Sequence, residues 1–162
     1  MASNEYWKYY SQISSLKYKF NYFLIILLKL SFKSVEESDA EFLYDLLKER
    51  TGIVNISHKS LPSWEEHLKF IKSKPYAFWE IILIDGNNVG DIYLTNRDEI
   101  GIFIKKDFQF NGYGSMALNE FMKKTGKKRF LANINPTNYK SIQFFGKNGF
   151  THIISTYHKK ID

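Results

Sequence analysis

The sequence of 162 residues contains no cysteine. Without cysteine the chain has no disulfide scaffold, no thiolate zinc site and no cysteine nucleophile. The absence also suits a reducing compartment, and we expect a cytoplasmic protein. We expect no metal site.

The sequence also lacks an apolar run long enough to span a membrane. Its longest run, residues 22–28, is far shorter than the roughly 20 residues that a membrane-spanning helix needs,. A secretory signal would require a basic start and a small-residue cleavage site, and neither is present. A run of this length suits a strand buried on both faces, and we expect the first strand at 22–28 and no membrane partner.

Repeats, low-complexity tracts and linkers are missing as well. The composition, with 44% apolar residues, 14 Phe, 11 Tyr and 3 Trp, is sufficient for a packed core and excludes whole-chain disorder,. We therefore expect one domain over residues 21–162, preceded by an N-terminal extension at 1–20 whose role the sequence does not reveal.

Negative charge is the scarcer sign. Lys and Arg number 23 against 17 Asp and Glu, which gives a net charge of +6. Such a surplus attracts phosphate groups of any origin, although a lysine-rich surface explains it equally well. A nucleic-acid-binding protein would gather its basic residues on one face. Here they are spread along the chain, and we rank that function last.

Periodicity and turn residues predict alternating helices and strands. Ser38 and Glu41 have the spacing of a capping box that opens a helix, and a second helix is expected to begin near Pro62 or Ser63 and to stop before Pro75,. Two short turns connect three strands, which must be antiparallel. The expected elements after Pro75 are strands at 77–84, 89–95 and 98–105, a helix at 112–124, a strand at 129–135, a helix from Thr137 to Asn148 and a strand at 150–157. This is an α+β fold.

Two segments carry the chemistry. In residues 103–115 a strand leads into a loop with glycines at 112 and 114, where the next helix begins. The free amides of a first helical turn form an anion site, which a phosphate or pyrophosphate would fill. In residues 133–150 Pro136 breaks a strand, and an Asn at the start of the next helix can reach into the resulting gap.

Together these segments resemble the GNAT superfamily of acyl-CoA-dependent N-acetyltransferases. Gln109-x-x-Gly112-x-Gly114 is similar to its Gln/Arg-x-x-Gly-x-Gly/Ala signature, and Asn138-x-x-Ser141 with the later Phe-Phe and Gly-Phe pairs is similar to its following block. The resemblance implies a mixed, mostly antiparallel sheet of about six to seven strands, splayed between strands 4 and 5 and flanked by about four helices. It also implies acetyl-CoA as cofactor.

The resemblance assigns cofactor contacts to backbone groups. Backbone of Ile102 and Ile104 would pair with the pantetheine arm and polarise the acetyl carbonyl, and Asn138 would bond the pantetheine side. The pyrophosphate would be held by the loop, with Lys105, Lys106 or Lys140 adding charge. The loop residues are Gln109, Asn111, Gly112, Tyr113, Gly114 and Ser115.

A base must remove a proton from the amine before or during attack. The position where the family often places an acidic residue falls on Asp98 or its neighbour Glu99, and only one of the two can face the cleft because side chains alternate along a strand,. Solvated turn carboxylates are the alternative for both. His67 lies in a Glu-Glu-His stretch that resembles amino-sugar and ribosomal-protein acetyltransferases, which suggests an acceptor contact or base; a partly exposed helix histidine is the alternative.

The family's proton-donating Tyr is Phe145 here, so the general acid stays open, with Tyr113, Tyr139 and Tyr157 as candidates. We expect direct acetyl transfer in a ternary complex to a small-molecule or peptide amine, with an amino sugar favoured over a protein N-terminus, a lysine or a small amine. A non-catalytic acyl-CoA binder is the second hypothesis. The short C-terminus would leave a sheet edge uncovered, which favours a homodimer.

Overall fold

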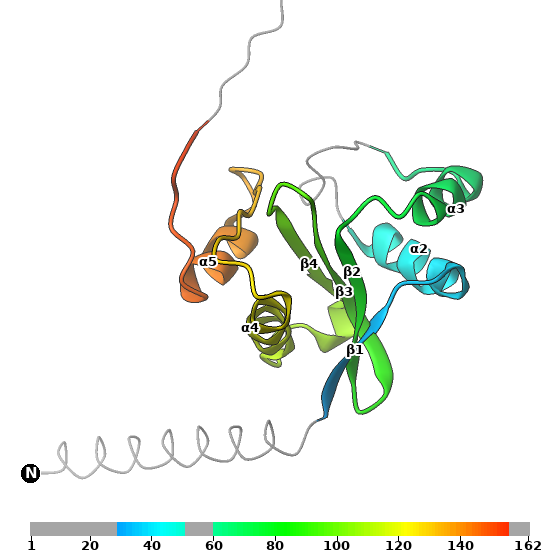
Figure 1. The fold of residues 1–162 in the computed structure, drawn as a ribbon, viewed down its shortest axis with the longest axis horizontal. Helices are drawn as coiled ribbons and strands as arrows, with labels where there is room; N and C mark the ends of the chain where they lie inside the picture. The colour runs from blue at the N-terminus through cyan, green and yellow to red at the C-terminus, as the bar shows by residue number, and fades with distance from the viewer. Residues whose placement is uncertain (1–28, 51–59, 156–162) are drawn as a thin grey trace, which may run out of the picture.

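The computed structural model describes residues 29–50 and 60–155. In this part of the chain four strands form one antiparallel sheet in the order β1-β2-β3-β4. Helices α2 and α3 cover one face of the sheet, and α4 and α5 lie on the other (Figure 1). The α+β class and the antiparallel arrangement expected from the sequence are confirmed.

The first described strand is β1, Leu30–Ser34, which pairs along its whole length with β2, Phe78–Ile84. The strand expected at 22–28 lies outside the described residues, as does the extension at 1–20. β3 comprises Asn87–Leu94 and β4 comprises Ile100–Ile104. The strands β2, β3 and β4 match the three consecutive antiparallel strands that the sequence predicts.

The hairpin between β2 and β3 follows from its two turn residues. Asp85 and Gly86 both have positive φ, +50° and +82°, and Ile84 pairs directly with Asn87. Positive φ at both central positions is the geometry that matches the twist of antiparallel strands, and Asp-Gly supplies it at low cost.

Helix α2, Ala40–Glu49, begins differently from the sequence prediction. A short 3-10 turn, η1 at Glu37–Asp39, precedes it, and the capping box joins Glu36 to Asp39. The predicted Ser38–Glu41 box is therefore wrong, because Ser38 lies inside the 3-10 turn that Glu36 opens. Helix α3, Trp64–Lys72, begins as predicted, since Ser63 accepts from the backbone N–H of Glu66.

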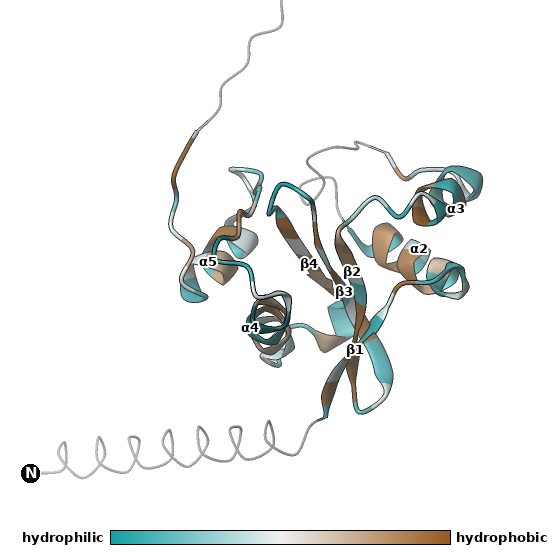
Figure 2. Ribbon diagram, viewed as in Figure 1, coloured by the Kyte–Doolittle hydropathy of each residue, from teal (hydrophilic) through white to brown (hydrophobic). Residues whose placement is uncertain are grey.

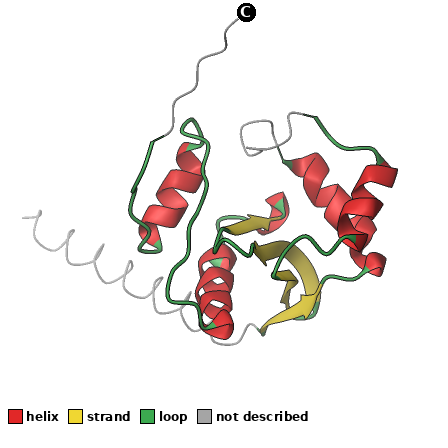
Figure 3. Cartoon of the chain, turned by 45° about the horizontal axis from the view of Figure 1, so that its top comes forward, coloured by secondary structure: helices red, strands yellow, loops and turns green. Residues whose placement is uncertain are grey.

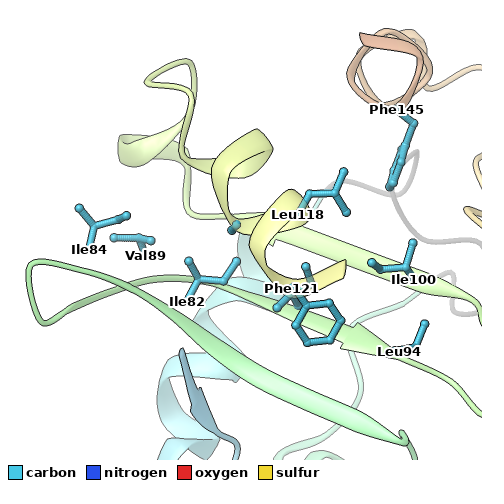
Figure 4. Close-up of a cluster of buried hydrophobic side chains, with 10 residues drawn as sticks. Ile82, Ile84, Val89, Leu94, Ile100, Leu118, Phe121 and Phe145 are labelled. Carbon is cyan, nitrogen blue, oxygen red and sulfur yellow. The ribbon is translucent and has the colours of Figure 1, made fainter. Parts of the chain in front are cut away.

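Hydrophobic residues lie on the strands and on parts of the helices that cover them (Figure 2). Because side chains alternate along a strand, each face of the sheet has its own core. On the α4 side, Leu118 and Phe121 of α4 pack against Ile82, Leu94 and Ile100 of the sheet (Figure 4). On the other side Ile81 packs against Leu43 and Leu46 of α2 and Ile71 of α3.

Helix α4, Tyr113–Thr125, matches the prediction and ends at Gly126 in the left-handed conformation. Helix α5, Tyr139–Lys147, lies on the same side of the sheet (Figure 3). Its cap is Asn138, whose side chain accepts from the N–H of Ser141 at 3.1 Å, and not Thr137 as expected. Thr137 instead donates its hydroxyl to Asn135.

The predicted strand at 129–135 is wrong except at one residue. Only Leu131 pairs with the sheet, in a parallel bridge to Glu99. The prediction of a strand at 150–157 is also wrong for residues 150–155, which have no strand structure and are exposed after Phe150; residues 156–157 are not described. In the described residues no helix is long and apolar enough to cross a membrane.

Candidate active site

The turn before α4 presents free backbone amides. Gly112 occupies the N-cap position with φ +82°, and no side chain caps the helix there. The first amide to enter the helical hydrogen-bond ladder is that of Met116, which donates to Gly112 O at 3.1 Å. The amides of Tyr113, Gly114 and Ser115 therefore remain at the positive end of a 13-residue helix, where an anion is stabilised,.

The loop leading to this turn is anchored on β4. Gln109 Nε2 donates to Ile104 O at 2.8 Å, which brings two of the predicted cofactor residues together. Asn111 Nδ2 donates to Gln109 O at 3.2 Å within the same loop. Phe110, between them, has φ +64° and is 90% exposed. The loop is thus ordered by its own polar side chains while its outer surface stays open.

The register of β4 determines where its backbone groups point. Thr95 N donates to Glu99 O and Lys105 N to Val89 O, so the odd-numbered residues of β4 exchange hydrogen bonds with β3,. The N–H and C=O groups of Ile100, Ile102 and Ile104 must then point away from β3. The bonds that Ile100 makes to Leu131 and that Ile104 O accepts from Gln109 confirm this direction. Between these two occupied positions, both backbone groups of Ile102 face the outer edge.

The remaining residues that the sequence predicts to bind the cofactor lie where α4 meets α5. A Cβ built on Gly114 would be 3.1 Å from the Phe144 ring of α5, which is a tight contact, and 3.6 Å from Ile104, which is an ordinary one, so glycine lets α5 approach the turn without a shift of the Phe144 ring. Ser115 Oγ accepts from Asn148 Nδ2 at 3.1 Å, which ties the same turn to the end of α5. Asn138 uses its side-chain oxygen to cap α5.

Cationic side chains accompany this turn. Lys105 and Lys106 follow β4, and Lys140 of α5 has its Nζ 5.9 Å from the centre of the Phe110 ring. The backbone of Lys106 also donates to Glu49 at 2.7 Å, which fixes the loop against the end of α2. Lys105 and Lys106 therefore precede the exposed turn in the sequence, and Lys140 approaches Phe110 from α5.

The two candidate carboxylates have different surroundings. Asp98, at φ +61°, pairs with Lys127 at 3.0 Å and Arg129 at 3.6 Å, and the bond from Lys127 lowers the pKa of its carboxyl. Glu99 Oε2 accepts hydrogen bonds from Thr95 Oγ1 and Arg97 Nη2, both at 3.3 Å. Because Ile100 and Ile102 pack in the α4-side core, alternation places Glu99 on the opposite, α2–α3 face,.

His67 lies inside the contact between α2 and α3. It is 3% exposed, and its Nε2 is 2.8 Å from Ala40 O. The rings of Tyr44 and Trp64 pack against it. Burial lowers the pKa of its imidazole, while the bond to Ala40 acts in the opposite direction. His67 is therefore a buried neutral histidine and not the partly exposed helix residue that was the alternative.

The sequence analysis missed one close contact on β4. Tyr93 of β3 pairs with Gly101, and a Cβ built on Gly101 would fall 2.2 Å from Cζ and 2.4 Å from Oη of Tyr93. The phenol thus lies directly over β4. A single glycine inside a predicted strand was the signal, because such a glycine often marks close approach of another group.

Two other features lie apart from the turn. A hollow of about 590 Å³ between β1 and α4 is lined by none of the residues predicted for the site; its lining is Lys29, Leu30, Phe32, Met116, Asn119, Glu120 and Lys124. Among the described residues, no His, Asp and Glu side chains gather in a group that could hold a metal ion.

Comparison with known proteins identifies a family for this chain. Residues 29–151 match the family model described as acetyltransferase (GNAT) domain. No curated protein matches the sequence.

Solved structures share the fold. RimL, a ribosomal L7/L12 alpha-N-protein acetyltransferase solved with coenzyme A, is 20% identical with a TM-score of 0.64, over 75% of this chain and 80% of that one. A domain from Methanocaldococcus jannaschii is 25% identical with a TM-score of 0.65, over 76% and 89%. The spermidine/spermine N-acetyltransferase SpeG from Vibrio cholerae is 15% identical with a TM-score of 0.61, over 75% and 79%.

Proposed function

Because this chain belongs to the GNAT acetyltransferase family, we propose that it transfers an acetyl group from acetyl-CoA to a primary amine that enters from the α2–α3 face of the sheet. The family makes the chain an acetyl-CoA-dependent N-acetyltransferase. The proposal concerns which residues do the work and which amine is used.

The observation that carries the assignment is the position of Ile102. Its outward N–H and C=O lie at the free edge of β4, and the uncapped amides of Tyr113–Ser115 begin the helix that follows the same strand. An extended ligand that carries an amide-bearing arm followed by a pyrophosphate needs an open strand edge for the arm and, next to it, free amides for the pyrophosphate. In the proposed complex, Ile102 and Ile104 backbone bond the arm, the loop amides hold the pyrophosphate, and Lys105, Lys106 and Lys140 add positive charge.

The opening for the thioester begins just beyond Leu131. There the chain leaves β4, so no strand in the described part of the chain covers the edge of Ile102. A backbone donor on this edge would stabilise the charge that builds on the acetyl oxygen during attack. Asn138, at the start of α5, would bond the arm from the other side of the opening with its remaining amide group.

Glu99 is the better candidate for the base of the two carboxylates. It is on the α2–α3 face, while Asp98 is paired with two cations in a turn. In the proposed step the amine forms a bond to the acetyl carbon, the carbon–sulfur bond breaks, and Glu99 takes the amine proton directly or through water. The leaving thiolate takes a proton from water, since Phe145 cannot supply one.

The acceptor expected from the sequence, a nucleotide-linked amino sugar, stays part of the proposal. RimL acts on a ribosomal protein and SpeG on spermidine, and both are structurally similar to this chain. A screen for thiol release should therefore compare three amines, namely a UDP-linked amino sugar, an unblocked peptide and spermidine.

Gly112 offers a sharp test of cofactor binding. A Cβ there would meet nothing within 4 Å, and Asn and Asp both tolerate positive φ and both cap helices,. Gly112→Asn and Gly112→Asp are nearly isosteric and differ in one negative charge. We expect calorimetry to show acetyl-CoA binding that Gly112→Asn retains and Gly112→Asp weakens at least 10-fold.

Equal affinity of the two variants for acetyl-CoA would show that the pyrophosphate does not bind at this turn. Absence of acetyl-CoA binding by the wild type would contradict the whole proposal. Binding without thiol release from any of the three amines would favour the second hypothesis, a non-catalytic acyl-CoA binder.

A further inference from the structure

The contact between Tyr93 and Gly101 places a hydroxyl group on the acceptor side of β4. The side chains of Ile92 and Leu94 lie in the α4-side core, so the Tyr93 side chain between them lies on the α2–α3 face,. Cζ and Oη are among its atoms nearest to the position a Gly101 Cβ would take, so the distal end of the ring covers the strand. The next residue, Ile102, carries the outward backbone groups described above.

Neighbouring aromatic rings hold the Tyr93 ring in place. Tyr76 stacks on Tyr93 with 4.1 Å between ring centres and an angle of 11°. Trp79 packs edge-on against Tyr76 at 5.1 Å. Tyr93 itself is half-buried rather than sealed. A rigid aromatic ring with its polar end over an edge strand is well prepared to hold a ligand group.

Other polar groups near Tyr93 already have partners. Asp91 accepts from Arg50 at 2.8 Å with one oxygen and from Trp79 at 3.1 Å with the other. Glu99 accepts from Thr95 and Arg97. The Tyr93 hydroxyl, in contrast, has no hydrogen-bond partner within the described part of the chain. A hydroxyl both donates and accepts, so its capacity remains available.

We propose that the Tyr93 hydroxyl accepts a hydrogen bond from the acceptor amine and orients the amine's lone pair toward the thioester above Gly101. This inference rests on the proposed function, because it needs the acetyl group at the edge of β4. Burial raises the pKa of Tyr93, so the phenol keeps its proton at neutral pH and acts as a positioning group rather than a base. Gly101 is part of the device, since any side chain there would displace the ring.

A structural explanation competes with this one. Aromatic rings often cover a cross-strand glycine simply to complete the packing of a sheet. Both explanations require the ring, but only the proposal requires the oxygen. Tyr93→Phe separates them because it keeps the ring and removes the hydroxyl.

The matched control is Tyr44→Phe. Its hydroxyl donates to Pro62 O at 2.9 Å and therefore has a structural partner. We expect Tyr93→Phe to keep the acetyl-CoA dissociation constant within about twofold and to lower kcat/KM for the amine about 3- to 10-fold, mainly through KM, as for loss of one hydrogen bond. Tyr44→Phe should lower the melting temperature and leave kcat/KM unchanged.

The readout is steady-state thiol release with whichever of the UDP-linked amino sugar, unblocked peptide and spermidine the wild type uses. If it uses none, slow hydrolysis of acetyl-CoA replaces it, since the same hydroxyl would orient water. An unchanged rate in Tyr93→Phe with intact acetyl-CoA binding overturns this inference alone. If the wild type does not bind acetyl-CoA, the proposed function is overturned, and the inference with it.

Discussion

The amide nitrogen of Ile100 donates to Leu131 O at 2.8 Å, and the amide nitrogen of Leu131 donates to Asp98 O at the same distance. This pair of bonds joins β4 to the following segment at one point. On one side of it the turn with Asp98 and Glu99 is closed, and on the other side the edge at Ile102 is open. The bridge therefore marks the point on the β4 edge where the closed part beside the candidate base ends and the open part at Ile102 begins.

The two neighbouring carboxylates should differ in kinetics. We expect Glu99→Gln to lower the rate of acetyl transfer about 100-fold or more, in the range typical of general acid–base catalysis, with acetyl-CoA binding unchanged. Asp98→Asn is the matched control, because it removes the same charge one residue earlier and should reduce transfer far less. Equal losses in kcat for the two variants would contradict the assignment of Glu99. Steady-state kinetics with calorimetry of acetyl-CoA make the measurement.

Gly101 should not tolerate even a methyl group. A Cβ there would lie 2.2 Å from the Tyr93 ring, so Gly101→Ala must displace either the ring or the strand. Overpacking of this kind costs about 1–3 kcal/mol in the free energy of unfolding. Urea unfolding of Gly101→Ala, Tyr93→Ala and the double variant should show strong coupling, because the clash disappears once the ring is gone. Strictly additive losses in the free energy of unfolding would contradict a clash between the two side chains.

A helical glycine provides the control for that series. Gly146 lies within α5, and a Cβ there meets nothing within 4 Å. Gly146→Ala should therefore stabilise the protein, by about 0.5–1 kcal/mol, since alanine loses less backbone entropy on folding than glycine. The same substitution should thus have opposite signs at positions 101 and 146.

The sequence predicted most of the elements that build the site because their signals are local. Asp85-Gly86 determines a hairpin, Ser63 caps α3, and Gly112 begins α4, and each of these depends on neighbours in the chain. The loop motif also predicted an order of cofactor contacts along this segment, which stays a prediction. These features can be recognised without knowing what packs against them.

The failures involve partners distant in sequence. Residues 129–135 have strand-like composition, but pairing is limited to Leu131 because the chain then leaves β4. His67 was predicted as an exposed or acceptor-facing residue, and only the packing of α2 on α3 shows that its imidazole bonds Ala40 O. The contact of Tyr93 with Gly101 depends on strand register, because a shift of one residue between β3 and β4 would abolish this contact.

Removing one partner of the pair Arg50–Asp91 should destabilise the protein strongly,. Asp91 is 2% exposed and bonds both Arg50 and Trp79, while the buried Arg50 Nε has no hydrogen-bond partner among the described residues. Asp91→Asn keeps the shape and can still accept from Trp79, but it leaves the arginine charge uncompensated. Breaking one side of a buried pair costs about 3–5 kcal/mol, and the partial exposure of Arg50 favours the lower value. Urea unfolding should show the loss; a change below about 1 kcal/mol would show that solvent compensates Arg50.

His67 should make stability depend on pH. Its pKa in the folded protein is lowered from the ordinary 6.5, chiefly by burial, so the unfolded chain binds a proton more readily than the folded one. The stability that neutral His67 contributes is complete above pH 6.5 and is lost as the pH falls from 6.5 toward the folded pKa, with a slope of at most about 1.4 kcal/mol per pH unit. His67→Gln removes the titration and leaves the chain's other three histidines unchanged. We therefore expect the difference in unfolding free energy between wild type and His67→Gln to shrink between pH 7.5 and pH 5.5. A constant difference over this range would mean that the imidazole becomes protonated as easily in the folded protein as in the unfolded chain.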